Sequence, residues 1–287
     1  MNKIKLIMTD LDGTALQPDR VTISKRLLTA FEQASRLGIH IVPITGRQFV
    51  RLPSILCTDL PWKEICVLNN GGEIRHCSDG NLIDAVHMPY EDALTAIELA
   101  NQYQTPIELN DDRKIVMTKM DYKQLCSFPV RELQYHIKND LVNYVHIVEN
   151  LGGYIKENKI PVGKLTLPYV QQGCRSELFQ KMNELPVSCV WGSPNGMEIT
   201  ARLATKGQGL LRVCRYFNLL PENCIAFGDS GNDIAMLQAA GIGVAMGNAP
   251  DEVKAVADII ADTNEKDGVA KIIEKYVLER SYDQEET

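Results

Sequence analysis

The chain has 287 residues, of which 23% are charged, and its formal net charge is −7. This length allows one large or two modest domains, each with its own core. The negative balance offers no basic surface for nucleic acid or for an anionic membrane, and no apolar run approaches the ~18 residues of a membrane span. The eight cysteines show neither a CxxC pair nor zinc-ligand spacing. We therefore expect a cytoplasmic protein with reduced thiols and with no nucleic-acid or membrane partner.

Strands and helices alternate along the first part of the chain. Residues 4–9, 39–44 and 65–68 are short apolar runs typical of buried strands. A helix is predicted over residues 24–37, with Ser24 as its N-cap.

The last part of the chain repeats this alternation. The pattern predicts helices at residues 206–217, 233–240, 250–257 and 269–279 and strands at residues 224–227, 242–245 and 259–260. Strands that alternate with helices need right-handed crossovers, which give a parallel sheet covered on both faces. The predicted fold class is therefore α/β, with a Rossmann-like three-layer core around a parallel sheet.

The pattern changes between residues 85 and 191. We predict helices at residues 91–104, 133–149 and 175–185, strands at residues 164–167 and 187–191, and a hairpin of residues 107–110 and 114–118 around Asp111 and Asp112. This mixture indicates a separate α+β unit inserted into the parallel-sheet domain. The predicted domains are thus a core of residues 1–84 and 192–287 and an inserted α+β cap of residues 85–191.

Four acidic residues follow two of the predicted strands. Asp10 and Asp12 come directly after the first strand, and residues two apart on an extended chain point to the same side. Asp229 and Asp233 follow the strand at residues 224–227. Ligands of open α/β sheets bind at the carboxyl ends of the strands. Carboxylates ~4 Å apart there repel by roughly 4 kcal/mol at an effective dielectric of 20. A divalent cation removes that cost, and oxygen ligands of this kind predict Mg²⁺.

Two further segments offer groups that bind phosphate. Thr45, Gly46 and Arg47 follow the strand at residues 39–44 and supply a hydroxyl, backbone amides and a guanidinium. Lys206 begins a predicted helix, so its ammonium and the positive end of the helix both favour an anion. Each segment alone is common in unrelated proteins. Together, and in this order along the chain, the acids and these two segments indicate a site for phosphoryl transfer.

The segments also match a known set of motifs. The runs DLDGT, ITGR, TKG and GDSGNDIAML occur in this order. With these four motifs the sequence resembles the haloacid dehalogenase-like (HAD) hydrolase superfamily. Within that superfamily it resembles the Cof-type subfamily, which has a large α/β cap (type IIB). The resemblance covers the whole chain. One departure is Ala15, where the family usually has a leucine, and it puts no catalytic role in doubt.

The resemblance implies a role for each motif. Asp10 would be the nucleophile that accepts the phosphoryl group. Asp12 would protonate the leaving oxygen and then activate the water that hydrolyses the intermediate. Thr45 and Lys206 would hold the phosphoryl oxygens. Further phosphate contacts would come from Gly46, Arg47 and Asn232.

A metal site is implied by the same resemblance. Mg²⁺ would be held by the carboxylates of Asp10 and Asp229 and by the backbone carbonyl of Asp12. Asp233 would support the site by ordering waters or Lys206. Asn248 and Asn264 are two further polar residues near the motifs. We interpret them either as loop and capping residues or as substrate contacts.

The predicted function is that of a Mg²⁺-dependent phosphatase, a phosphoric monoester hydrolase that acts through an aspartyl-phosphate. Its substrate would be a small phosphorylated metabolite, either a sugar phosphate or a phosphorylated cofactor. Two alternatives stay open. One is a phosphotransferase or mutase that uses the same intermediate, and the other is a catalytically silent regulatory module on the same fold. The sequence leaves open the substrate itself, the cap residues that select it and the oligomeric state.

Overall fold

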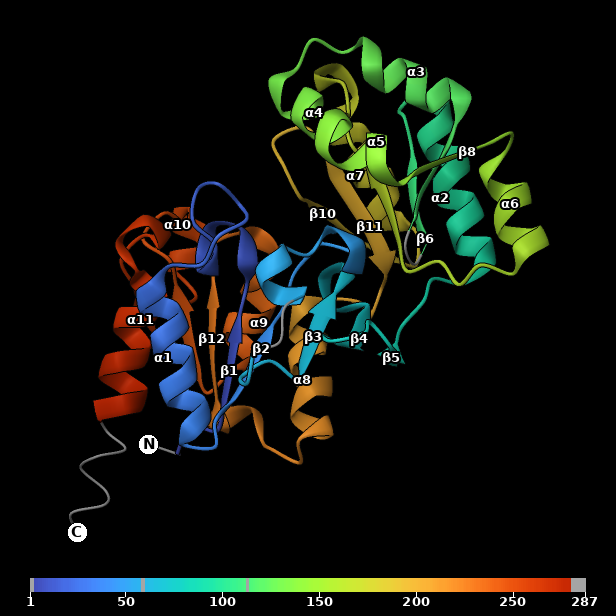
Figure 1. Cartoon of the computed structure of the whole chain (residues 1–287). Helices are drawn as coiled ribbons and strands as arrows, with labels where there is room; N and C mark the ends of the chain where they lie inside the picture. Colours follow the sequence, from blue (N-terminus) through green and yellow to red (C-terminus); the bar gives the residue numbers. More distant parts are fainter. Residues whose placement is uncertain (1–2, 58–59, 112–113, 280–287) are drawn as a thin grey trace. The chain divides into compact units, whose positions relative to one another are not determined.

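The structure, a computed structural model, describes residues 3–57, 60–111 and 114–279. Its contacts divide the chain into two compact units (Figure 1). The core unit comprises Met1–Thr45, Leu52–Asp84 and Lys206–Thr287. The inserted unit comprises Gly46–Arg51 and Ala85–Thr205. Each unit has its own sheets and its own buried apolar cluster.

A five-stranded sheet of order β14-β13-β12-β1-β2 forms the centre of the core unit. Its strands are β1 (Leu6–Thr9), β2 (His40–Pro43), β12 (Cys224–Gly228), β13 (Ile242–Ala245) and β14 (Ile259–Ile260). All neighbouring pairs are parallel. The first and last parts of the chain therefore meet at the middle of one sheet, where β1 pairs with β12.

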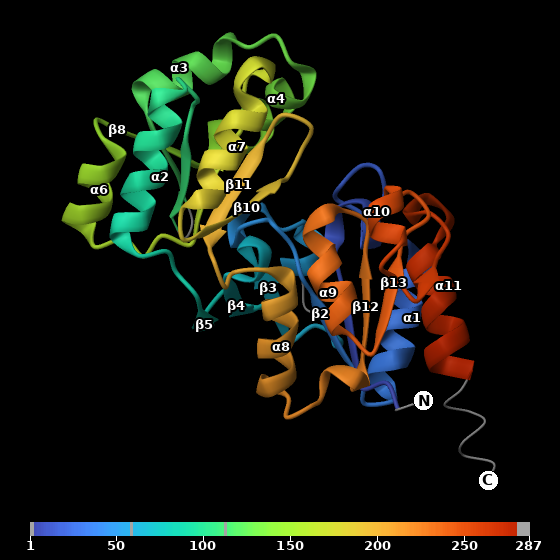
Figure 2. The ribbon, with the colours of Figure 1, turned by 180° about the vertical axis from the view of Figure 1, so that it is seen from behind.

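Helices cover both faces of this sheet, as the sequence predicted. α1 (Lys25–Arg36) and α11 (Gly268–Ile273) lie on one face, while α8 (Lys206–Tyr216) and α9 (Ile234–Ala239) lie on the other (Figures 1 and 2). The short helix α10 (Asp251–Lys254) precedes β14. Every residue of β1 and β12 is buried, which explains why all of them except Thr9 are apolar or glycine. The predicted α/β class with a three-layer core is confirmed.

The ends of α1 follow from two local signals. The side chain of Ser24 accepts a hydrogen bond from the backbone N–H of Leu27, which confirms Ser24 as the N-cap. Gly38 ends the helix with a φ of +74°, a left-handed conformation that glycine adopts without steric cost.

β3 (Ile65–Leu68) is a strand, as predicted, but it belongs to a small sheet of order β3-β4-β5. β4 (Glu73–His76) pairs with it in the antiparallel direction, and β5 (Leu82–Ala85) follows. Isolated parallel bridges between Ile41 and Lys63 and between Ile44 and Val67 connect this sheet to β2. The sequence did not predict β4 and β5, because both mix charged and apolar residues over only four positions.

A six-stranded sheet of order β10-β11-β9-β6-β7-β8 forms the centre of the inserted unit. Its strands are β6 (Glu108–Asp111), β7 (Lys114–Thr118), β8 (Val145–Val148), β9 (Lys164–Leu167), β10 (Val187–Trp191) and β11 (Met197–Ala201). Neighbours are antiparallel except β7 and β8. The predicted hairpin is confirmed as β6 and β7, although Asp112 at its turn lies outside the described residues.

One face of this sheet packs against three helices. α2 (Tyr90–Gln102), α6 (Leu151–Asn158) and α7 (Arg175–Glu184) contribute to an apolar cluster that contains Leu109 and Leu165 of the sheet. α2 and α7 lie where the sequence predicted helices, whereas α6 was not predicted.

The helix predicted over residues 133–149 is confirmed as far as Tyr144 and is wrong beyond it. The chain is helical through α4 (Arg131–His136), the π-helical η5 (Ile137–Leu141) and the short α5 (Val142–Tyr144), and then enters β8. The VHIV sequence of β8 is rich in β-branched residues, and β8 pairs in parallel with β7. Strand pairing at the sheet edge thus overrides the helical pattern. The unpredicted α3 (Lys119–Ser127) follows β7 directly.

The inserted unit extends beyond the predicted boundary at residue 191. β11 pairs with both β9 and β10, so the chain stays in the inserted sheet and the unit ends at Thr205. The segment Gly46–Arg51 also belongs to this unit by its contacts. Such a segment leaves no local sequence signal, because its partners lie far along the chain. Within the described residues, no helix is both long and apolar enough to cross a membrane.

We expect the core unit to depend on Phe31 of α1, which is 1% exposed and lies 4.8 Å from Trp62, centroid to centroid. Replacement of Phe31 by alanine should lower the free energy of unfolding by about 3–5 kcal/mol, because it leaves a cavity. Urea unfolding followed by tryptophan fluorescence measures this loss. Leu37→Ala, at a position that is 38% exposed, is the control and should cost less than about 1 kcal/mol. Equal losses in the two variants would contradict the packing described here.

Candidate active site

Asp10 directly follows β1 at the centre of the core sheet. Its backbone N–H donates to the carbonyl oxygen of Phe227 in β12 at 2.9 Å, which continues the pairing of the two strands. β12 then leads into the loop that carries Asp229 and Asp233. Parallel pairing therefore brings acids from both ends of the chain to one edge of the sheet, where open α/β sheets bind ligands.

The ammonium of Lys206 lies between two of these acids. Its Nζ is 2.6 Å from Oδ1 of Asp10 and 2.6 Å from Oδ1 of Asp233, and the lysine side chain is 1% exposed. Burial alone would lower the pKa of Lys206, but the charges of the two aspartates outweigh it and hold that pKa above its ordinary value. Lys206 therefore contributes a fixed positive charge to the site.

Asp233 connects this ion pair to the loop after β12. Its Oδ2 accepts hydrogen bonds from the backbone N–H groups of Asp229 at 3.0 Å and Ser230 at 2.9 Å. Both oxygens of this fully buried carboxylate are thus engaged within the protein. The arrangement fits the predicted supporting role of Asp233, which orders Lys206 and the backbone that carries Asp229.

Gly13 and Thr14 shape the contact between the loop after β1 and Asp229. The hydroxyl of Thr14 donates to Oδ1 of Asp229 at 3.0 Å. Gly13 has a φ of +78°, and a Cβ atom at this position would collide with the Asp229 carboxylate. Only glycine permits this turn and this close approach together. Thr14 was missed as a site residue, although it lies within the first motif.

Two carboxyl groups in the cluster have raised pKa values. Burial, followed by the charges of Asp233 and Asp229, raises the pKa of Asp10 well above its ordinary value despite the opposing charge of Lys206. Burial and the charge of Asp233 raise the pKa of Asp229 to about 6. The protein alone therefore holds more negative charge here than Lys206 balances.

The donor set fits a divalent cation. Ligand oxygens of Asp10, Asp229 and Asp233 all lie within 4.8 Å of one another. Against the single charge of Lys206, three ionised carboxylates leave an excess of two negative charges. Because Asp233 already uses both oxygens, Asp10 and Asp229 are the better direct ligands. Oxygen ligands with this charge match what Mg²⁺ requires.

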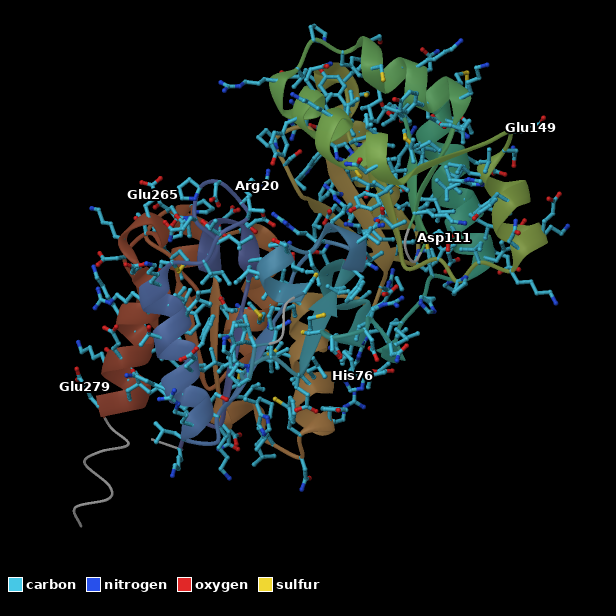
Figure 3. The ribbon with its side chains drawn as sticks, in the orientation of Figure 1. Arg20, His76, Asp111, Glu149, Glu265 and Glu279 are labelled. Atoms are coloured by element: carbon cyan, nitrogen blue, oxygen red, sulfur yellow. The ribbon has the colours of Figure 1, made fainter. Side chains whose placement is uncertain are left out.

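Asp12 is paired with an arginine that the sequence analysis missed. Nε of Arg20 donates to Oδ1 of Asp12 at 2.9 Å. Arg20 lies in the loop after β1 (Figure 3), and its φ is 62°. In the same loop, Asp19 accepts hydrogen bonds from the backbone N–H groups of Val21 and Thr22. No sequence signal marks Arg20, because the turn alone brings it to Asp12.

Asn70 links Thr45 to Asn232. Its backbone N–H donates to the carbonyl oxygen of Thr45 at 3.0 Å, and its Oδ1 accepts from Nδ2 of Asn232 at 3.1 Å. Asn70 has a φ of 57°, which asparagine tolerates better than most residues. Thr45 is 1% exposed, so its backbone and side chain are fixed beside β3. A role of Thr45 and Asn232 in phosphate binding stays a prediction.

Gly46 and Arg47 belong to the inserted unit, whereas the Asp10 cluster belongs to the core unit. The carbonyl oxygen of Gly46 accepts from Nζ of Lys164 at 2.5 Å, and Nη1 of Arg47 donates to the carbonyl oxygen of Arg51 at 3.0 Å. Their predicted phosphate contacts therefore stay predictions.

The side chains of Asn248 and Asn264 form hydrogen bonds to the backbone of the loop after Asp10. Nδ2 of Asn248 donates to the carbonyl oxygen of Gly13, and Nδ2 of Asn264 donates to that of Leu16, each at 2.9 Å. Oδ1 of Asn248 also accepts from the backbone N–H of Asn264 at 3.2 Å. These contacts support the structural interpretation of the two asparagines.

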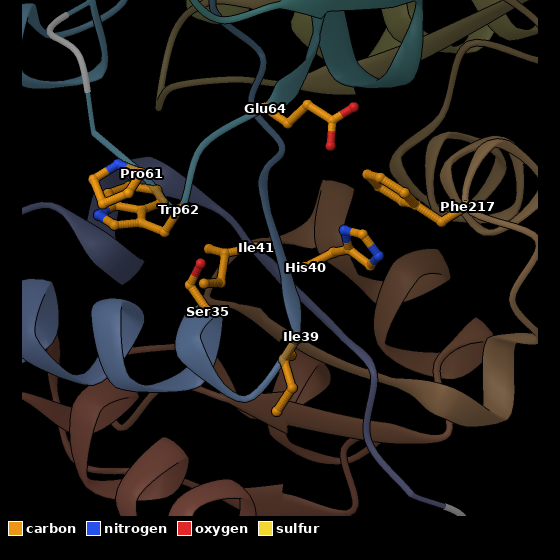
Figure 4. Close-up of a pocket in the computed structure, with 9 residues that line it drawn as sticks. Ser35, Ile39, His40, Ile41, Pro61, Trp62, Glu64 and Phe217 are labelled. Carbon is orange, nitrogen blue, oxygen red and sulfur yellow. The ribbon is translucent and has the colours of Figure 1, made fainter.

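A separate hollow of about 210 Å³ in the core unit is a poorer candidate for this chemistry (Figure 4). Its lining includes Glu64 and the stacked rings of His40 and Phe217, whose centroids are 3.8 Å apart. His40 pairs with Leu6 at the start of β1, whereas Asp10 follows the end of that strand. The hollow thus lies at the opposite edge of the sheet from the acids.

Comparison with known proteins identifies the family. A sequence profile of haloacid dehalogenase-like hydrolases matches residues 7–273. The chain belongs to the haloacid dehalogenase-like hydrolases. This confirms the family that the four motifs indicated, and with it the prediction of a hydrolase.

Relatives of this hydrolase include named phosphatases. A 5-amino-6-(5-phospho-D-ribitylamino)uracil phosphatase from Bacillus subtilis is 30% identical over 96% of each chain. A pyridoxal phosphate phosphatase from Escherichia coli is 29% identical over 96% of this chain and 99% of its own. A solved haloacid dehalogenase-like hydrolase from B. subtilis, 24% identical, covers 95% of this chain and 100% of its own with a TM-score of 0.81, which shows the shared fold.

We expect replacement of Gly13 by alanine to abolish most of the activity without unfolding the hydrolase. The new Cβ atom would displace the Asp229 carboxylate. Gly38→Ala is a matched control, because Gly38 also has a positive φ, of +74°, but no atom lies within 4 Å of an added Cβ. Both variants should lose about 1 kcal/mol of stability to backbone strain, while only Gly13→Ala loses phosphate release. Equal activities in the two variants would contradict this geometry.

Metal binding should depend on pH through Asp229. Its folded pKa of about 6 exceeds the ordinary value of 3.8, so between these pH values the folded state binds more protons than the unfolded state. The stability contributed by protonated Asp229 is therefore lost as pH rises through about 6 in metal-free protein. A bound divalent cation offsets that loss, because it favours the ionised carboxylate.

We therefore expect Mg²⁺ to raise the melting temperature more at about pH 7.5 than at about pH 5. Thermal unfolding in chelator and in excess Mg²⁺ at both pH values measures this difference. Asp229→Asn should remove most of the Mg²⁺ effect. An equal rise at both pH values, or an unchanged rise in the variant, would exclude Asp229 as a metal ligand.

Proposed function

We propose that this hydrolase is a Mg²⁺-dependent phosphatase of small phosphorylated metabolites and that it works through a phosphorylated Asp10. The main support is the cluster of Asp10, Asp229 and Asp233 around the buried ammonium of Lys206. This cluster combines a nucleophile, a fixed positive charge and oxygens that can bind a metal. These are the groups that phosphoryl transfer in two steps requires.

In the first step, a carboxylate oxygen of Asp10 would attack the phosphorus atom while the ester bond breaks and Asp12 protonates the leaving oxygen. In the second step, Asp12 would take a proton from a water molecule that attacks the same phosphorus atom. This releases inorganic phosphate and restores Asp10. The contact with Arg20, at 2.9 Å, supports a fixed orientation of Asp12.

Lys206 and Thr45 would hold the oxygens of the transferring group. The ammonium of Lys206, 2.6 Å from Asp10, is placed to balance charge that develops beside the nucleophile. Gly46, Arg47 and Asn232 would add further phosphate contacts.

Mg²⁺ would be held by the carboxylates of Asp10 and Asp229 and by the backbone carbonyl of Asp12. When bound, it supplies positive charge that favours the ionised form of Asp10 and offsets the charge of the phosphate. The raised pKa of Asp10 in the protein alone supports the need for such a charge.

The substrate would be a small phosphorylated metabolite, either a sugar phosphate or a phosphorylated cofactor. Two relatives are named for a phosphoribitylamino-uracil and for pyridoxal phosphate, which are both small metabolites with a phosphate ester. We further propose that the inserted unit selects the leaving group.

Asp10→Asn should lower phosphate release from p-nitrophenyl phosphate in Mg²⁺ at least about 1,000-fold, because the neutral amide is a poor nucleophile. The fold should be kept, since the side chains have nearly the same shape. Circular dichroism and the melting temperature check this.

Asp251→Asn makes the same chemical change at an exposed position of α10 and should retain the activity. If folded Asp10→Asn keeps the wild-type rate, covalent catalysis by Asp10 is excluded. If wild-type protein with Mg²⁺ releases no phosphate from this ester or from a panel of metabolites, the proposed phosphatase function fails.

A further inference from the structure

Three consecutive residues after β3 have a left-handed backbone. The φ angles of Asn69, Asn70 and Gly71 are 51°, 57° and 100°. Glycine adopts such a conformation without steric cost, whereas two asparagines in succession keep it only where the surrounding structure holds them. All three residues are buried. This Asn69–Gly71 turn belongs to the core unit, which also contains the Asp10 cluster.

The turn also buries a polar atom at a cost. Asn69 is 3% exposed, and its Oδ1 has no hydrogen-bond partner within residues 3–57, 60–111 and 114–279. A buried acceptor without a partner costs free energy, as does each asparagine in the left-handed region. Strain of this kind is concentrated at functional sites, where the rest of the structure offsets it. Local stability therefore does not explain the turn.

Two hydrogen bonds join Asn70 to residues that we propose to bind phosphate. Its backbone N–H donates to the carbonyl oxygen of Thr45 at 3.0 Å, and its Oδ1 accepts from Nδ2 of Asn232 at 3.1 Å. The backbone N–H of Thr45 donates to the carbonyl oxygen of Val67 in β3 at 2.9 Å. Both backbone polar groups of Thr45 are therefore held by β3 and by the turn that follows it.

The turn is also attached to α8. Nη1 of Arg212 donates to the carbonyl oxygen of Gly71 at 3.0 Å, and Nε of Arg212 lies 2.8 Å from Oδ2 of Asp84. Arg212 lies in α8, the helix that begins with Lys206. One helix therefore fixes both the turn and the buried ammonium.

A second path of contacts connects Asn70 to Lys206. Oδ1 of Asn232 accepts from the hydroxyl of Ser230 at 2.7 Å, while its Nδ2 donates to Asn70. The backbone N–H of Ser230 donates to Oδ2 of Asp233, whose Oδ1 lies 2.6 Å from Nζ of Lys206. The two paths together form a closed ring that starts and ends in α8.

We propose that Asn70 is a positioning residue for phosphoryl transfer. It acts through its two neighbours, because its N–H fixes the backbone of Thr45 and its Oδ1 fixes the amide of Asn232. Both groups are thus aligned with Lys206 before phosphate binds, so the reaction needs no reorganisation of the protein at these positions. The proposal rests on the proposed phosphatase function.

Asn70→Gly tests the side chain. Glycine tolerates the positive φ, so the contact with Thr45 is kept while the acceptor for Asn232 is lost. With p-nitrophenyl phosphate and Mg²⁺, kcat should fall at least about tenfold and KM should change less than about twofold, because alignment for the transition state is lost. Circular dichroism and the melting temperature check the fold. A folded variant with the wild-type kcat would overturn the proposal.

The matched control is Asn218→Gly. Asn218 also has a positive φ, of 54°, but it is exposed and follows the end of α8 that lies away from Lys206. This variant makes the same chemical change and should keep both kcat and KM.

A double variant shows whether Asn70 acts through Asn232. The protein with both Asn232→Ala and Asn70→Gly should have a kcat within about twofold of that of Asn232→Ala alone, since the second substitution finds no contact left to remove. A residue that only stabilises the fold would give independent effects, which multiply. Multiplied effects would overturn the proposal.

Arg212→Met decides the question if Asn70→Gly does not fold. It removes the donor to Gly71 but leaves both asparagines in place, and it should lower kcat at least about threefold with little change in KM. A folded Arg212→Met variant with the wild-type kcat would then overturn the proposal.

The wild type separates this proposal from the phosphatase function. Release of phosphate by the wild type, with unchanged rates in the folded variants, would overturn only the role of Asn70. No release by the wild type from p-nitrophenyl phosphate or from a panel of metabolites would overturn the phosphatase function, and the present proposal with it.

Discussion

The ammonium of Lys206 between the carboxylates of Asp10 and Asp233 is the interaction on which the rest of this site depends. An unpaired charge at such depth would cost several kcal/mol, so Lys206 requires a carboxylate beside it and both carboxylates are stabilised by its ammonium. The pairing joins the end of β1, the start of α8 and the loop after β12. Through its second oxygen, Asp233 also sets the backbone that carries Asp229. The same network that holds the strand ends together therefore places the proposed catalytic groups.

The acids of this site could be predicted because they follow apolar strands whose parallel pairing is itself predictable. The partners of these acids could not be predicted in the same way. Arg20 reaches Asp12 only through the shape of a turn, and Asn70 meets Asn232 through two loops far apart in sequence. Such contacts depend on tertiary structure and leave no period or spacing in the sequence.

The fold shows the same division between local and long-range information. The buried parallel strands and the N-cap at Ser24 follow from local patterns. β8 and β11 depend on strand partners, so the helix predicted over residues 133–149 and the domain boundary at residue 191 differ from the structure. Glu108 of β6 is a related case, because no local pattern marks its long-range contact: its side chain is completely buried and lies 2.6 Å from Nε2 of His136.

The central claim is that a phosphoryl group is transferred to Asp10. Acid quenching of a single turnover, followed by peptide mass spectrometry, tests it most directly. The account predicts that the peptide with residue 10 gains the mass of one phosphoryl group, and that the label disappears as phosphate is released. Phosphate release in the same samples without any label on that peptide at any time would contradict the account, and it would indicate direct attack by water.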